Sequence, residues 1–138
     1  RFFRDGSAID GAGLKQHMAA AYAWVDGMEA LLTELQALSV SMHALSNYPV
    51  WYQVVEQRLG LSRYVELSFI SCHTGLRKPA PEAFLHACEQ LAVPAEACLL
   101  IDDRAQNCDA AREVGLSAWR FEGSVPSLRQ ALVQYGIL

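Results

Sequence analysis

Short apolar segments alternate with helical segments along most of this chain, and this alternation restricts the folds that it can adopt. Four segments of four to six residues lack helical spacing and are mostly apolar, as strands buried on both faces are. The expected strands are Val40–Leu45, Leu67–Ser71, Cys98–Ile101 and Ser117–Phe121. Because helices separate them, the pattern predicts right-handed βαβ units and an α/β class: a parallel sheet in a three-layer αβα arrangement.

The helical segments have recognisable beginnings and ends. Pro81 suits the first turn of a helix, and Gly60 suits the residue after a helix. Residues 10–13 (DGAG) indicate a turn before the first helix. The expected helices are Leu14–Trp24, Met28–Leu38, Val50–Leu59, Pro81–Ala92, Ala105–Val114 and Ser127–Tyr135.

Length and charge exclude several classes of protein. A chain of 138 residues with 52% hydrophobic residues has the size and composition of one globular domain. The net charge is −4 and the 11 basic residues are scattered, so we expect no nucleic-acid partner. No apolar run approaches the roughly 18 residues of a membrane span. We therefore expect a soluble, intracellular protein without a membrane span.

The four cysteines lack the C-x-x-C spacing of a metal or redox motif. Cys88, Cys98 and Cys108 fall in segments expected to be buried as helix or strand. Buried cysteines away from such motifs usually pack as small apolar residues. We therefore expect them to be reduced thiols.

In parallel sheets, ligands bind beyond the carboxyl ends of the strands, where Ser46 and Asn47 follow the first expected strand. A hydroxyl and an amide there could bind a phosphate oxygen. The alternative is a turn that also caps the next helix.

Lys78 lies just before the helix that begins at Pro81. An ammonium group and the positive end of the helix dipole would then both attract an anion. The alternative is an ordinary solvated lysine, and we expect its neighbour Arg77 to lie on the surface.

Asp102 and Asp103 end the most apolar strand. Adjacent carboxylates repel each other unless a cation or hydrogen bonds compensate, and Mg²⁺ binds one or two carboxylates together with water and phosphate. Asn107, four residues after Asp103, could orient one of these carboxylates. The alternative places Asp103 at the N-cap of the next helix and Asp102 in solvent.

Taken in order, Ser46, Lys78 and the Asp102–Asp103 pair resemble the second, third and fourth motifs of the haloacid dehalogenase (HAD) superfamily. Residues 44–52 (ALSNYPVWY), 77–82 (RKPAPE) and 101–107 (IDDRAQN) resemble its chloroplast flavin mononucleotide (FMN) hydrolase branch. The resemblance covers residues 26–138. It implies the HAD fold, which is a Rossmann-like three-layer αβα fold with a parallel sheet.

The resemblance also implies a role for each site residue. Ser46 and Asn47 would bind the phosphate, Lys78 would neutralise charge on the phosphate and the nucleophile, and Asp103 would bind Mg²⁺ with Asp102 as a second or water-mediated ligand. The implied reaction is attack by an aspartate on a small phosphorylated metabolite such as FMN, followed by hydrolysis of the aspartyl-phosphate. The resemblance implies the chloroplast stroma as the location.

One motif of the family is missing from this sequence. In the family, the nucleophile lies in a D-x-D motif after the first strand, and this sequence contains no D-x-D. Asp5-Gly6-Ser7 is similar to the end of that motif, but no strand precedes it, and we reject it. We expect residues 1–25 to be the tail of a helical cap domain and residues 26–138 to be the core. The first strand and most of the cap would lie upstream of Arg1.

Two functions remain open at this point. The first is a phosphatase represented by a segment that is inactive alone because it lacks the nucleophile. The second is a HAD-fold subunit without catalysis that has a structural or interaction role in a larger assembly. In either case, an upstream segment or a partner chain should complete the sheet, and the strands at Val40–Leu45 and Cys98–Ile101 should not pair with each other.

Overall fold

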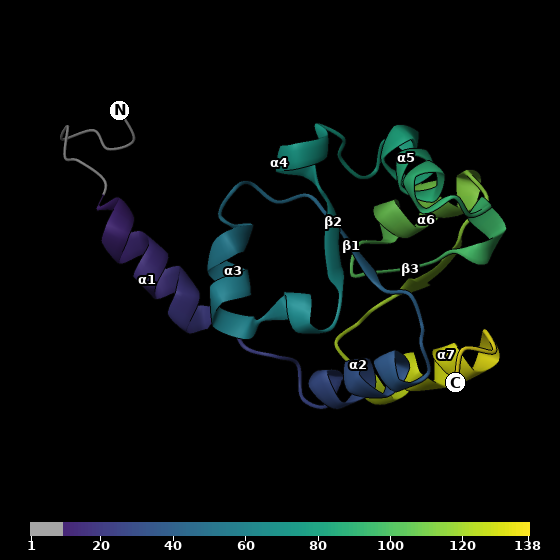
Figure 1. Ribbon diagram of the computed structural model, residues 1–138, viewed down its shortest axis with the longest axis horizontal. Helices are drawn as coiled ribbons and strands as arrows, with labels where there is room; N and C mark the ends of the chain where they lie inside the picture. Colours follow the sequence, from purple (N-terminus) through teal and green to yellow (C-terminus); the bar gives the residue numbers. More distant parts are fainter. Residues whose placement is uncertain (1–9) are drawn as a thin grey trace.

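The structure is a computed structural model, and it describes residues 10–138. Within these residues the chain forms parallel strands and helices in the expected order (Figure 1). The strands are β1 (His43–Ser46), β2 (Glu66–Ile70), β3 (Leu99–Asp102) and β4 (Ser117–Arg120). The helices are α1 (Gly11–Ala21), α2 (Met28–Ala37), α3 (Tyr52–Leu59), α4 (Ser71–Thr74), α5 (Pro81–Leu91), α6 (Ala105–Glu113) and α7 (Val125–Gln134), with 3-10 turns at Leu61–Arg63 and Ala95–Ala97.

The predicted elements are all present with boundaries shifted by up to three residues, and two further details differ. The segment Asp10–Gly13 is not a turn, because α1 begins at Gly11 and the Asp10 carboxylate caps it by accepting hydrogen bonds from the backbone of Ala12 and Gly13. The short helix α4 was not predicted. Four residues are too few to show a helical period, and it ends at Gly75 with a φ of 73°.

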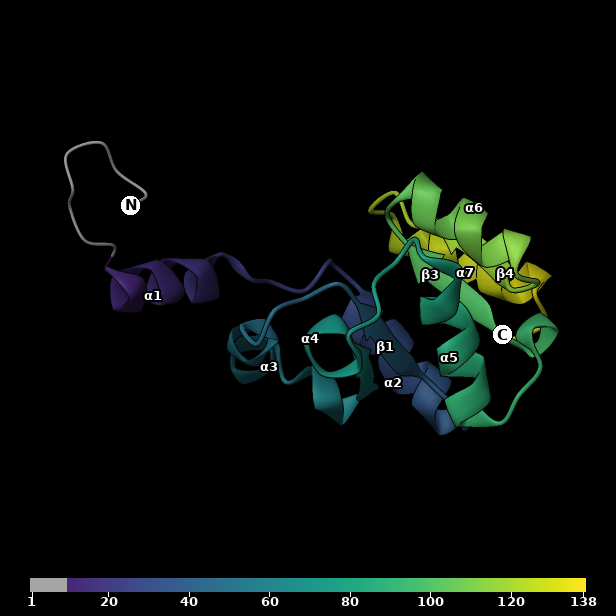
Figure 2. The same ribbon diagram turned by 90° about the horizontal axis from the view of Figure 1, so that it is seen from above.

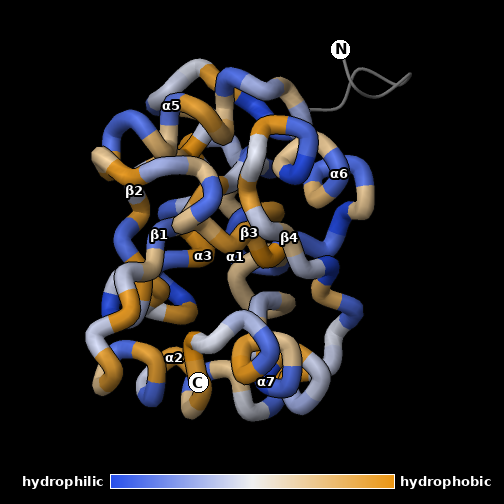
Figure 3. The backbone as a smooth tube through the Cα atoms, turned by 90° about the vertical axis from the view of Figure 1, so that its right-hand side faces the viewer, coloured by the Kyte–Doolittle hydropathy of each residue, from blue (hydrophilic) through white to orange (hydrophobic). Residues whose placement is uncertain are grey.

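Helices cover both faces of the sheet, which confirms the three-layer arrangement (Figures 1 and 3). On one face, α5 and α6 bury Phe84, Cys108 and Ala111 against Leu100 of β3 and Ala118 of β4. On the other face, α2 and α7 bury a leucine cluster. That cluster consists of Leu31, Leu35, Val125, Leu128 and Leu132, packed against Leu99 and Trp119 of the sheet.

The sheet consists of two separate parallel pairs, β1 with β2 and β3 with β4. Within residues 10–138, β1 and β3 do not pair with each other, which confirms the expectation for these two strands. The inner edges of both strands therefore lack a strand partner in the described part of the chain. Unpaired strand edges are unfavourable in a folded domain and are usually covered.

The free edge of β1 can be identified from its hydrogen bonds. The Met42 carbonyl accepts from the backbone of Glu66, 2.9 Å away, and so points toward β2. The Leu45 carbonyl instead accepts from Lys78 Nζ, which also binds Asp102 at the end of β3, so the backbone of Leu45 faces the gap.

The free edge of β3 follows in the same way. The carbonyls of Cys98 and Asp102 accept from β4 and its end, at 3.0 and 2.9 Å. The backbone groups of Ile101 therefore face the gap, and its side chain is 40% exposed although it lies in the middle of an apolar strand.

Helix α1 projects away from the rest of the described chain (Figure 2). It has no buried residue and lies beside α3, where Lys15 stands over the Trp51 ring and the hydroxyls of Tyr22 and Tyr48 form a hydrogen bond. The boundary near residue 25 stays a prediction, and Asp5-Gly6-Ser7 lies outside the described residues. None of the helices in residues 10–138 is both long and apolar enough to cross a membrane.

The free edges predict a pattern of amide exchange. In the 138-residue chain, the amides of Leu45 and Ile101 should exchange with solvent faster than those of Ala44 and Leu100, because only the latter face a paired strand. Hydrogen exchange resolved by NMR measures this directly. Equal protection of the two pairs of amides would show that the gap is closed within these residues.

Candidate active site

The candidate site lies at the carboxyl ends of the strands. Ser46 is the last residue of β1 and Asp102 is the last residue of β3. Lys78 lies in the segment between α4 and α5, three residues before Pro81 opens α5. The parallel sheet therefore brings residues that are distant in sequence to one edge, on opposite sides of the gap.

The Lys78 side chain connects the two strand pairs. Its Nζ donates to the Leu45 carbonyl of β1 and to Oδ2 of Asp102 at the end of β3, each at 2.5 Å. The side chains of Lys78 and Asp102 are only 10% and 4% exposed. The ion pair is therefore buried, and it spans the gap at the edge where ligands bind in such sheets.

Asn47 fixes the backbone of Lys78. Its Oδ1 accepts from the Lys78 N–H at 2.8 Å, and its Nδ2 donates to the Lys78 carbonyl at 2.6 Å. These contacts give the Asn47 amide a different partner from the phosphate that we expected. They place the Lys78 segment beside the end of β1.

Asp102 is held through both carboxylate oxygens. Oδ2 accepts from Lys78, and Oδ1 accepts from the Arg104 backbone and from Asn107 Nδ2, each at 2.9 Å. Burial acts to raise the pKa of Asp102, but the hydrogen bonds from Lys78, Arg104 and Asn107 outweigh it and hold the pKa below its ordinary value. Asp102 is therefore ionised, and its contacts are those of a group that positions Lys78.

Asp103 differs from its neighbour because it is exposed. In the described part of the chain its one hydrogen bond is at its backbone carbonyl, which accepts from Arg120 at 3.3 Å. The alternative in which Asp103 caps α6 and Asp102 lies in solvent is wrong, since Arg104 is at the N-cap and Asp102 is buried. The Asp103 carboxylate thus stays available to a cation.

The donors fit Mg²⁺ only in part. Residues 10–138 contain no group of three or more acidic, histidine or cysteine side chains that could hold a metal. Mg²⁺ is satisfied by one or two carboxylates with water and phosphate, so Asp103 could supply one ligand and a second carboxylate would have to come from elsewhere. Half-buried Ser46 forms no side-chain hydrogen bond within the described residues, so its hydroxyl is free to donate.

Sequence reasoning did not find two of the contacts at the site. The Leu45 carbonyl binds Lys78 through a backbone atom, which leaves no signal in the residue type. Arg120 of β4 supports the turn at Asp103 from 17 residues away. Only the pairing of β3 with β4 brings it there.

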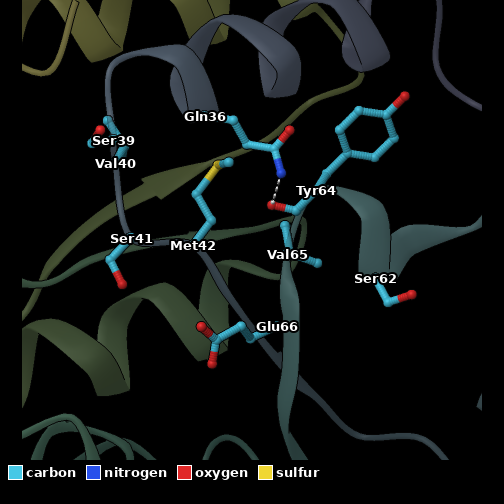
Figure 4. Close-up of a pocket in the computed structure, with 9 residues that line it drawn as sticks. All are labelled: Gln36, Ser39, Val40, Ser41, Met42, Ser62, Tyr64, Val65 and Glu66. Carbon is cyan, nitrogen blue, oxygen red and sulfur yellow. Dashed lines mark hydrogen bonds between the residues drawn. The ribbon is translucent and has the colours of Figure 1, made fainter.

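A pocket of about 350 Å³ lies at the other end of β1 and β2 (Figure 4). Met42, just before β1, and Glu66, the first residue of β2, line it. It therefore opens at the amino ends of the strands, away from Lys78 and Asp102.

The sequence matches a family of hydrolases. The family described as haloacid dehalogenase-like hydrolase matches residues 15–115 of the chain. The chloroplast flavin mononucleotide hydrolase 1 of Arabidopsis thaliana is 42% identical over 136 residues, which cover 99% of this chain and 55% of that protein. The N-acetylmuramic acid 6-phosphate phosphatase of Pseudomonas aeruginosa is 28% identical over 73% of this chain and 45% of its own length. The chain spans about half the length of the curated relatives that it matches.

Solved structures show the same fold. A HAD family enzyme of Bacteroides thetaiotaomicron, in complex with magnesium and inorganic phosphate, matches with a TM-score of 0.75 and 20% identity over 89% of this chain and 67% of that one. A hydrolase of Streptococcus pneumoniae matches with a TM-score of 0.75 and 22% identity over 86% of this chain and 62% of that one. The match over most of the sequence, together with the shared fold, shows that the chain belongs to the haloacid dehalogenase-like hydrolase family.

Proposed function

We propose that the chain carries the phosphate-binding and metal-binding half of a Mg²⁺-dependent phosphate-monoester hydrolase. The observation that carries the proposal is the buried Lys78–Asp102 pair at the carboxyl edge of the sheet. A lysine in a dry site attracts a phosphate more strongly than one in water. Asp102 stabilises this ammonium group through the ion pair between them.

Each side chain then has a role that fits its contacts. Lys78 binds a phosphate oxygen and offsets the charge that develops during transfer. Ser46 donates its hydroxyl to a second oxygen, while Asn47 acts through Lys78 by holding its backbone. Asn107 and Asp102 position Lys78 from the β3 side.

Asp103 would hold the metal, because its carboxylate lies beside the end of β3 and has no hydrogen bond or ion pair within residues 10–138. A bound Mg²⁺ would offset negative charge on the phosphate oxygens. We assign Asp102 to Lys78 rather than to the metal, because both of its oxygens already accept hydrogen bonds.

The nucleophile is an aspartate that these 138 residues do not contain. We propose that it ends a strand lying between β1 and β3, supplied by an upstream segment of the same protein or by a partner chain. The gap beside Leu45 and Ile101 supports this position, because a parallel strand there would end next to Lys78. On this account residues 1–25 are the tail of the cap, and residues 26–138 belong to the core.

The proposed substrate is FMN, and the proposed location is the chloroplast. Both rest on the relative from Arabidopsis thaliana, whose name gives that substrate and that compartment. The second candidate, a HAD-fold subunit without catalysis, is favoured by the absence of a D-x-D motif from the sequence. A strand followed by D-x-D in the gene upstream of residue 1 would support the enzyme, and its absence would support the inactive subunit.

The purified 138-residue chain should bind phosphate without turning over a phosphate monoester. Positioning groups remain, but the covalent step requires the nucleophile. Titration with inorganic phosphate should give saturable binding that Lys78→Met weakens and Arg77→Met does not, since Arg77 is exposed. Mg²⁺-dependent turnover of FMN or p-nitrophenyl phosphate by this chain alone would refute the proposal that the nucleophile lies outside it.

In a chain that includes the proposed strand, Asp103→Asn should raise the Mg²⁺ concentration needed for half-maximal rate and lower kcat by about 10²–10³. The reason is that the amide keeps the shape of the side chain but loses its charge. Asp109→Asn is the matched control, because Asp109 is an exposed carboxylate of α6 that pairs with Arg112. Equal Mg²⁺ dependence in both variants would show that Asp103 is not a ligand of the metal.

The lowered pKa of Asp102 predicts a dependence of stability on pH. A group whose folded pKa is depressed contributes stability above its unfolded pKa, near 4, and loses it as the pH falls through the folded pKa. Asp102→Asn should therefore destabilise the chain by about 3 kcal/mol at pH 7, with the difference from wild type shrinking below about pH 4. Urea unfolding across this range measures it, and a difference that does not change with pH would contradict the role of the ionised carboxylate.

A further inference from the structure

We propose that Cys88 and Cys98 form a reversible intramolecular disulfide that links α5 to the start of β3. Their Sγ atoms are 3.8 Å apart, and both residues are free thiols in this structure. The inference is independent of the proposed phosphatase function.

The segment between the two cysteines already brings them together. Val93 donates from its backbone to the Cys88 carbonyl at 3.1 Å, and the Cys98 thiol contacts the Pro94 carbonyl at 3.9 Å. The segment after α5 thus folds back toward Cys88, so a bond between the sulfurs would close a loop that is already formed. On the other side, the backbone N–H of Ser117 in β4 donates to the Cys98 carbonyl at 3.0 Å.

The two thiols differ in access, and this difference sets the order of reaction. Cys88 is 7% exposed within the core, whereas Cys98 is half-buried at its edge. A small soluble disulfide can reach Cys98 from solvent. Cys88 can then react with Cys98 without meeting the oxidant.

The oxidant we name is a low-molecular-weight disulfide such as oxidised glutathione. The Cys98 thiolate attacks one sulfur of that disulfide, which forms a mixed disulfide and releases one glutathione thiolate. The Cys88 thiolate then attacks the Cys98 sulfur, which forms the Cys88–Cys98 bond and releases the second glutathione. The two cysteines lose two electrons and two protons, and the oxidised glutathione becomes two molecules of the reduced form.

The environment of Cys98 makes the first step slow at neutral pH. Burial, and then the hydrogen bond from Cys88, raise the pKa of Cys98 to about 11. Only the thiolate attacks a disulfide, so the rate should rise about tenfold per pH unit below that value. The pair would therefore respond to sustained oxidation rather than to a brief pulse.

The disulfide would leave the phosphate site unchanged. Lys78 precedes the first turn of α5 and Asp102 ends β3, so their ion pair lies at the opposite ends of the two elements from Cys88 and Cys98. Oxidation should therefore raise the stability of the α5–β3 unit without altering the affinity of the chain for inorganic phosphate.

The test uses the 138-residue chain with exposed Cys72 changed to serine, so that Cys72 cannot form other disulfides. The protein is incubated with oxidised glutathione at about pH 8.5, where the thiolate fraction is larger than at neutral pH. It is then digested after glutamate residues under non-reducing conditions. Because Glu89 and Glu96 lie between the two cysteines, the disulfide would join the peptides 83–89 and 97–113. The second peptide also contains Cys108, so the link must be assigned with the Cys98 and Cys108 variants below.

We expect the linked peptides, an unfolding temperature above that of the reduced chain, and its return to the reduced value with dithiothreitol. A further Cys98→Ser substitution should abolish the link and the shift, whereas Cys108→Ser should preserve the link. A Cys98 that stays in the mixed disulfide with glutathione, or thiols still free after prolonged incubation, would overturn the proposal. A lower unfolding temperature after oxidation would overturn it too, since the native positions would then not accommodate the bond.

Discussion

The buried ion pair between Lys78 and Asp102 is the interaction on which the rest of the site depends. An ammonium group and a carboxylate that are both almost inaccessible to water would be costly to bury separately. Together they satisfy each other, and Asn107 adds a hydrogen bond to Asp102. Lys78 also donates to the Leu45 carbonyl, which leaves one of its three N–H donors for a ligand. No buried side-chain nitrogen or oxygen in residues 10–138 lacks a partner.

The same pair explains how two separate strand pairs form one site. Backbone hydrogen bonds join β1 to β2 and β3 to β4, but within the described residues none joins β1 to β3. Lys78 crosses this gap at the carboxyl edge, and the helices on both faces cover the strands (Figure 3). The site is thus positioned by side chains where a sheet would normally use a strand. Because of this arrangement, an added parallel strand would place its last residue beside Lys78.

Much of the fold could be predicted from the sequence because its signals are local. Gly60 after α3, Pro81 at the start of α5 and the apolar segment before Asp102 each mark a boundary by their own chemistry. The convergence of Ser46, Lys78 and Asp102 at one edge could be predicted for the same reason, since parallel strands direct their carboxyl ends to one edge. The different surroundings of Asp102 and Asp103 could not be predicted, because adjacent aspartates look alike in sequence. They differ only in the folded chain, where Lys78 and Asn107 contact Asp102 and Asp103 stays exposed.

The central claim is that these residues hold the phosphate and that a strand from outside them brings the nucleophile. The most direct test is to mix the 138-residue chain with a separately expressed polypeptide that carries the preceding segment, and to measure hydrolysis of p-nitrophenyl phosphate with Mg²⁺. The account predicts that neither part is active alone and that the mixture regains activity, which Lys78→Met in the 138-residue chain abolishes. An active continuous protein whose rate is unchanged by Lys78→Met would contradict it.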